Sequence, residues 1–132
     1  MTKLSCFMAT AALLLAASIT VAADLNSPPI APDELNLRLA DPAPPLVVDI
    51  RSPTEFSTGH VPGSINIPVP LLRKKLVEIR KAETLVLYCN DSRLTRLAER
   101  ILVTNRIQGF AHLDGGFNAW EDAELPVETS LR

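Results

Sequence analysis

The sequence contains few of the side chains that bind transition metals, and it has no excess of basic charge. It has two cysteines, Cys6 and Cys89, and two histidines, His60 and His112, and these four residues do not have the spacing of a metal-ligand cluster. Its formal net charge is −2, whereas proteins that bind nucleic acids or anionic membranes usually carry clustered positive charge. We therefore predict no metal site, no other cofactor and no nucleic-acid partner.

The sequence also lacks an apolar run long enough to cross a membrane. The stretch from Phe7 to Val21 is shorter than the ~20 residues of a spanning helix, and no basic residue directly follows it. Lys3 precedes this stretch, and small residues up to Ala23 come before the polar Asp24. This order is typical of a secretory signal peptide, so we predict that residues 1–23 are cleaved near Ala23. A membrane anchor is the alternative interpretation.

Cleavage would leave one cysteine, Cys89, in a single domain of residues 24–132 that has no contact with the membrane. Because residues 1–23 hold one basic side chain and no acid, the net charge of this domain would be −3. Exported domains normally use cysteines in pairs, as disulfides. A lone thiol in an oxidising compartment is therefore either a free reactive group or a buried, inert side chain.

Short apolar runs alternate with helical patterns along residues 24–132. Mostly apolar runs such as 84–88 are typical of buried strands in a parallel sheet. Ser52 and Glu55 have the spacing of a capping box at the start of a helix. The alternation predicts an α/β fold with a small, mainly parallel sheet of four to five strands and helices on both faces. We expect strands at 46–50, 64–67, 84–88 and 110–113, a helix capped by Asp33, a helix that begins at Pro53, helices at 71–81, 95–104 and 117–122, and an irregular segment at 24–31.

Cys89 lies between the apolar run at 84–88 and the helical pattern at 95–104. It is therefore expected at the carboxyl end of a strand, which is the sheet edge where ligands bind in α/β folds. The N-terminus of the next helix offers free N–H groups and the positive end of a dipole, and both favour an anion. We expect Cys89 to be a better thiolate there than a free cysteine.

Both halves of the sequence resemble the rhodanese-like domain family. The first half carries VDIRSPTEF at 48–56 and GHVPGSINIP at 59–68, and the second half carries YCN at 88–90 and LDGGFNAW at 113–120. The resemblance covers nearly all of residues 24–132, in the same order and spacing. With the predicted signal peptide, the sequence is most similar to the small single-domain periplasmic rhodaneses of bacteria, including the phage-shock type.

The resemblance implies a thiosulfate sulfurtransferase. In that family a cysteine at the strand end takes the outer sulfur of thiosulfate, releases sulfite and passes the sulfur from a persulfide to cyanide or a thiol. The resemblance also allows a protein as the partner that accepts the sulfur. By position Cys89 is the nucleophile. The active-site loop that surrounds the sulfur with backbone N–H groups corresponds here to Asn90, Asp91, Ser92, Arg93, Leu94 and Thr95.

Two residues of this loop depart from the family pattern. Many relatives have glycine where Ser92 stands, so we expect strain if the backbone needs a positive φ there. Asp91 adds a negative charge that opposes anion capture. Of the other loop residues, Arg93 is expected to direct its guanidinium toward the anion, and Thr95 is expected to be the N-cap of the helix.

Three residues outside the loop are expected to support it. Asp49 ends a strand at the same sheet edge, and it can anchor the loop or Arg51 through hydrogen bonds. His60 lies in a Gly-His-x-Pro-Gly turn. We expect its ring to hold this turn through hydrogen bonds rather than to act as a general base.

The sequence leaves three functions open. The first is an enzyme that transfers sulfur to a small acceptor, the second is a sulfur carrier loaded by a partner protein, and the third is a non-catalytic binding module. The retention of Cys89 argues against the third. A thiol phosphatase is disfavoured because that chemistry uses Cys-x5-Arg, and the position of the arginine holds Thr95.

Overall fold

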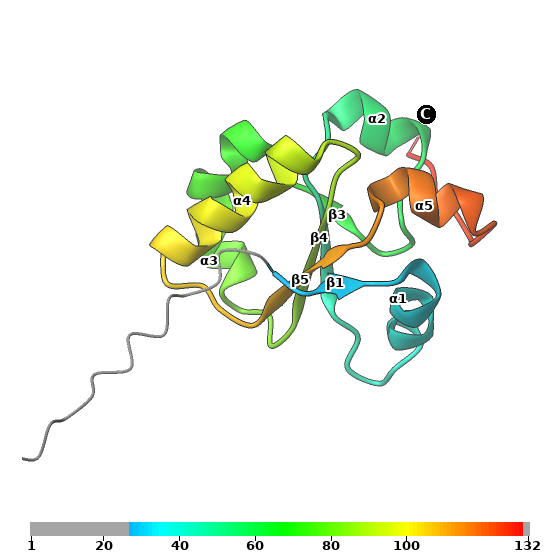
Figure 1. Ribbon diagram of the computed structural model, residues 1–132, viewed down its shortest axis with the longest axis horizontal. Coiled ribbons are helices and arrows are strands. Elements are labelled where there is room, and N and C mark those ends of the chain that lie inside the picture. The colour runs from blue at the N-terminus through cyan, green and yellow to red at the C-terminus, as the bar shows by residue number, and fades with distance from the viewer. Residues whose placement is uncertain (1–26, 131–132) are drawn as a thin grey trace, which may run out of the picture.

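Five parallel strands form the centre of the computed structural model, which describes residues 27–130 (Figure 1). Their order across the sheet is β1-β5-β4-β2-β3, and all neighbouring strands are parallel. The predicted α/β class and the predicted sheet are confirmed. The signal peptide predicted for residues 1–23 lies outside the described residues. The strands are β1 (Pro29–Ile30), β2 (Leu46–Asp49), β3 (Ile65–Asn66), β4 (Leu85–Tyr88) and β5 (Phe110–Leu113).

Helices cover both faces of the sheet, as predicted. The 3-10 helix η1 and the helices α3 and α4 pack on one face, and α1 and α5 pack on the other (Figure 1). Within residues 27–130, no helix is both long enough and apolar enough to span a membrane. The helices are α1 (Pro32–Leu39), α2 (Pro53–Thr58), η1 (Val69–Lys75), α3 (Leu76–Ile79), α4 (Ser92–Thr104) and α5 (Gly116–Asp122).

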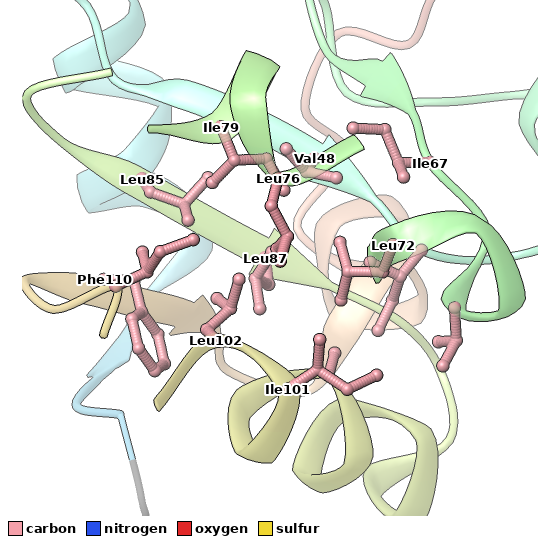
Figure 2. Close-up of a cluster of buried hydrophobic side chains, with 14 of the residues drawn as sticks. Val48, Ile67, Leu72, Leu76, Ile79, Leu85, Leu87, Ile101, Leu102 and Phe110 are labelled. Carbon is pink, nitrogen blue, oxygen red and sulfur yellow. The ribbon is translucent and has the colours of Figure 1, made fainter. Parts of the chain in front are cut away.

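Side chains alternate along β4, so each face of the sheet builds its own core. Leu85 and Leu87 face η1, α3 and α4, whereas Val86 and Tyr88 face α1 and α5. Figure 2 shows the first core, in which Leu87 lies among side chains from these helices. Leu87 is fully buried, and burial of such a leucine contributes about 1.5–3 kcal/mol. Burial on both faces explains why the β4 run is apolar throughout.

The edge strand β1 was not predicted, because its prolines suggested an irregular segment. Pro29 and Ile30 pair with His112 and Leu113 of β5. Two of the hydrogen bonds use carbonyl groups on the β1 side: Pro28 O accepts from the His112 N–H, and Ile30 O accepts from the Asp114 N–H. Proline lacks an N–H but keeps its carbonyl, so an edge strand tolerates it.

The predicted single helix at 71–81 is wrong, because the segment is two shorter elements. The 3-10 helix η1 follows Pro68 and contains Pro70, and it gives way to the α-helix α3 after Lys75. Lys75 has φ −106° and ψ 6°, which lies outside α-helical values. The pattern of apolar residues did not reveal this change of helix type.

Two helix starts differ from their predicted caps, and one agrees. The capping box of α2 is present, with the Ser52 hydroxyl accepting from the Glu55 N–H and the Glu55 carboxylate accepting from the Ser52 N–H. In α1, however, Asp33 is not the cap. The N-cap position is Ala31, which has no side chain able to cap. The third start, that of α4, shapes the site and is described below.

A buried polar cluster fastens the N-terminal end of the sheet to α4. The Ser27 hydroxyl donates to the Glu99 carboxylate and lies 2.7 Å from Nδ1 of His112. Glu99 also lies 3.2 Å from the same His112 nitrogen. Because Glu99 is only 2 % exposed, its carboxyl group relies on these two partners for polar contacts in place of water. The cluster therefore ties the start of β1 to α4 and to β5.

Candidate active site

The thiol of Cys89 lies at the carboxyl edge of the sheet, directly after β4 and three residues before α4. It is the free cysteine of the described residues, and it is 8 % exposed. Cys89 lines a cavity of about 860 Å³ whose walls come mainly from η1, α4 and the β2–α2 connection. A second cavity of about 440 Å³ also includes Cys89, together with Ser92 and Thr95 of α4. The thiol is thus at the predicted edge, beside space for a ligand.

Opposing effects act on the ionisation of Cys89. Burial raises the pKa of the thiol, and the negative charges of Asp49 and Glu55 raise it further. The backbone N–H groups of Asp91 and Asn90 lower it, and the Asp91 N–H lies 3.5 Å from Sγ. The net effect is a raised pKa. The expectation of an unusually good thiolate is therefore wrong for the ligand-free site, because burial and two carboxylates outweigh the amides.

The loop that follows Cys89 is shorter than the six residues predicted. Helix α4 begins at Ser92, so only Asn90 and Asp91 separate it from Cys89. Asp91 is the N-cap, and its carboxylate accepts from the Arg93 N–H at 2.8 Å. The prediction of Thr95 as the N-cap is therefore wrong. Its hydroxyl lies one turn into the helix and donates to the Asp91 carbonyl.

Arg93 and Ser92 also differ from expectation. The Arg93 guanidinium donates to the Asp91 carboxylate, at 3.2 and 3.3 Å, and its side chain is 89 % exposed. It therefore pairs with the loop's own acid instead of facing the cavity. Ser92 carries no strain, since the non-glycine residues with positive φ in residues 27–130 are Arg106 and Glu124. A helical first residue does not need the conformational freedom of glycine.

The start of α5 packs closely against the backbone of Cys89. Gly116 has φ +63°, and a Cβ atom there would lie 1.9 Å from the Cys89 carbonyl oxygen. The side-chain oxygen of Asn90 accepts from the Asn118 N–H at 2.9 Å. Gly116 and Asn118 were not predicted as site residues, although the Asp-Gly-Gly signature at 114–116 was the signal that could have found them. These contacts fix the direction in which the thiol leaves the sheet.

Asp49 and Arg51 form a buried pair next to the cavity. The Asp49 carboxylate accepts from the backbone N–H and the guanidinium of Arg51, at 2.6 to 3.0 Å. The guanidinium also donates to the Gly59 carbonyl and lies 4.2 Å from the ring centroid of Phe117. Asp49 thus anchors Arg51, as expected, and Arg51 lines the 860 Å³ cavity.

His60 holds a turn away from the thiol. Its ring stacks on Phe56 with the centroids 3.7 Å apart, and its Nδ1 lies 2.7 Å from the Phe56 carbonyl oxygen. Its Nε2 lies 3.6 Å from the Glu128 carboxylate. His60 lines neither cavity that contains Cys89. The His60 ring therefore holds its turn against α2 through one hydrogen bond and the stacking on Phe56, a positioning role as expected, and it does not line the space at the sulfur.

Of the predicted site residues, the 860 Å³ cavity brings together Cys89, Asn90, Asp91, Leu94 and Arg51. Two charged residues that the sequence did not single out for the site, Glu55 and Arg73, line it as well. No sequence signal marked Arg73, because it lies in a run of exposed basic residues that reads as a solvated helix face.

An α/β fold that holds one thiol at the carboxyl edge of a parallel sheet, before a helix, is suited to nucleophilic chemistry by cysteine. Residues 31–123 match the family model of the rhodanese-like domain, and the chain belongs to this family. It is 33% identical over 95 residues to a sulfurtransferase of Allochromatium vinosum, a match that covers 72% of this chain and 89% of the relative. The thiosulfate sulfurtransferase GlpE of Pseudoalteromonas translucida is 29% identical over 87 residues, with 66% and 83% covered. The predicted family is confirmed.

Solved structures agree with this assignment. The thiosulfate sulfurtransferase from Pseudomonas aeruginosa has a TM-score of 0.67 at 30% identity, over 79% of this chain but 20% of that protein. The BH2092 protein from Bacillus halodurans has a TM-score of 0.70 at 20% identity, covering 80% of this chain and 79% of its own, and it shows the fold alone. For several other curated relatives the match spans 37 to 59% of their length.

The contact between Gly116 and Cys89 can be tested with a matched pair of glycine variants. Gly109 also has a positive φ, +72°, but nothing lies within 4 Å of the position of an added Cβ. Gly109→Ala should therefore cost only the backbone term, about 1–2 kcal/mol. Gly116→Ala should cost about 3 kcal/mol or more, because the Cys89 carbonyl must also move. Urea unfolding measures both, and equal losses in the two variants would contradict the contact.

The raised pKa of Cys89 predicts how its reactivity depends on pH. The rate of alkylation by iodoacetamide should rise with pH and reach its midpoint above the ordinary thiol value of about 8.5. Glu55→Gln keeps the capping box but removes a negative charge that raises the pKa of Cys89. The midpoint should then fall, and alkylation at neutral pH should become faster. Glu83→Gln, at a position outside the Cys89 cavities, is the control and should leave the profile unchanged. A wild-type midpoint below the ordinary value would count against this account.

Proposed function

We propose that this protein is a thiosulfate sulfurtransferase that carries sulfur as a persulfide on Cys89. The observation that supports this most directly is the position of the thiol. It lines a cavity of about 860 Å³, with the N–H groups of Asn90 and Asp91 directed at Sγ. Membership of a family with sulfurtransferase relatives supports the same chemistry.

The proposed loading step uses Cys89 as the nucleophile. Its thiolate attacks the outer sulfur of thiosulfate, a new bond forms between the two sulfurs, and the bond to the sulfonyl sulfur breaks. Sulfite leaves with the electron pair, and Cys89 carries a persulfide. Thiolate, thiosulfate and persulfide are all anionic. Amide N–H groups can stabilise each of them without a separate acid or base.

In the second step an acceptor takes the outer sulfur. Cyanide or the thiolate of an acceptor thiol attacks it, the bond to Cys89 breaks, and Cys89 leaves as a thiolate. Arg51, held by Asp49, shapes the wall of the cavity. Arg73 is the cation in that wall that no described carboxylate pairs with, and it can offset part of the charge of a bound anion.

A sulfur carrier that is loaded by a partner protein is the second candidate. One observation favours it: the Asp91 carboxylate already occupies the N-terminus of α4 and accepts from the Arg93 N–H. This negative charge lies beside the place where thiosulfate would bind. A carrier would form the persulfide readily from a protein donor and slowly from thiosulfate. A non-catalytic binding module is the third candidate, and it requires Cys89 to be unreactive in the folded protein.

The activity of Cys89 separates these candidates. The purified protein should convert thiosulfate and cyanide into thiocyanate and sulfite, and Cys89→Ala should reduce the rate to that of the uncatalysed mixture, because no other described thiol can take the sulfur. Colorimetric detection of thiocyanate measures this. Turnover that survives the substitution would overturn the proposal. A persulfide that forms only from a protein donor would identify the carrier.

We also propose that the protein is exported to the periplasm and loses residues 1–23. Intact mass spectrometry of protein taken fresh from the periplasm should then give a chain that begins at Asp24. The same spectrum should contain a form one sulfur atom heavier, which reduction removes. A chain that retains residues 1–23 in the membrane fraction would instead indicate an anchor.

A further inference from the structure

The walls of the Cys89 cavity are more apolar than thiosulfate and cyanide require. On one side they include Leu94, Leu97 and Ile101 of α4, and on the other Pro68, Val69 and Pro70 at the start of η1. Leu94 is 38% exposed and Leu97 is 43% exposed. These two leucines thus present a continuous apolar edge to the space beside the thiol.

The cavity is also larger than thiosulfate and cyanide require. Its volume is about 860 Å³, which is within the range of pockets that take drug-sized ligands, about 300–1,000 Å³. Thiosulfate and cyanide are far smaller, and they would occupy only the end next to Sγ and the two amides. The remaining space has room for the body of a larger molecule.

The charged side chains around the cavity leave no excess of positive charge that could bind a larger anionic molecule. Arg51 is bonded to Asp49, and Asp91 is bonded to Arg93. Glu55 and Arg73 bring one charge of each sign. A ligand that extends along α4 and η1 therefore meets apolar side chains and balanced charge, which favours an uncharged molecule over a polyanionic one.

We propose that the sulfur acceptor is a small thiol with an uncharged, apolar body, which binds between α4 and η1 with its sulfur at Cys89. This inference rests on the proposed function. In the transfer, the acceptor thiol gives up its proton and its sulfur attacks the outer sulfur of the persulfide. The bond between the two sulfurs of the persulfide breaks, Cys89 leaves with the electron pair and takes up a proton, and the acceptor becomes a persulfide.

The groove can be tested without sulfur transfer by labelling the free thiol. Methyl, butyl and hexyl methanethiosulfonates react with Cys89 to form a mixed disulfide and release methanesulfinate. Each buried methylene group is worth about 0.8 kcal/mol, so the rate should increase about fourfold for each methylene that enters the groove. Leu97→Asn should flatten this dependence on chain length. Val77→Asn, at an exposed position of α3 outside the cavity, should keep it.

The acceptor step is then measured on protein whose persulfide has been verified by mass. Discharge to mercaptoethanol, mercaptobutanol and mercaptohexanol should accelerate along the series in the wild type and in Val77→Asn, and much less in Leu97→Asn. Equal rates for all three thiols would overturn the inference and point to a thiol presented by a partner protein. Failure to form the persulfide would overturn the proposed function instead, while the labelling series still decides whether the groove accepts an apolar body.

Discussion

The hydrogen-bond ladder that holds β4 between β2 and β5 determines where the thiol lies. β4 aligns Tyr88 with Asp49 of β2, and the ladder continues past the strand end, where the Ile50 N–H donates to the Tyr88 carbonyl. Cys89 and Arg51 therefore leave the sheet at the same edge and line one cavity. A shift of register by one residue would turn every β4 side chain to the opposite face, so two separate cores protect this alignment.

The environment of the sulfur balances protection against reactivity. Burial and nearby carboxylates favour the neutral thiol, whereas the amides of Asn90 and Asp91 favour the anion. Without a ligand, burial and the carboxylates outweigh the amides, so the pKa of the thiol is raised. A protonated thiol is a poor nucleophile and is oxidised slowly. A lone cysteine with this balance is less exposed to accidental oxidation, while its N–H groups remain directed at the sulfur for the charged species of a transfer reaction.

Local signals in the sequence predicted more of the fold than of the site. The β4 run is buried on both faces, so its composition alone identifies a central strand, and the Ser52–Glu55 capping box is a contact between near neighbours. The start of α4 was harder, because Asp91, Ser92 and Thr95 are all residue types that cap helices. Which one caps depends on how the chain leaves the sheet, and that is set by the distant Gly116 and Asn118.

The same distinction explains the remaining differences. Arg93 was expected to direct its guanidinium toward the anion, but the guanidinium pairs with the neighbouring Asp91 carboxylate at the start of α4 instead. β1 could not be read from its own residues, since a two-residue strand with proline gains its hydrogen bonds only from β5. Local composition cannot encode a pairing whose two members are about 80 residues apart.

That long separation has a consequence for how the molecule assembles. Among residues 27–130, β1 is the first strand, yet it pairs with the last one, β5, and Ser27 is bonded to Glu99 and His112, which also lie late in the sequence. Closing such a long loop is slow compared with forming contacts between neighbours. We therefore expect β1 to pair late in folding, and until it does the β5 edge is open to pairing with other chains.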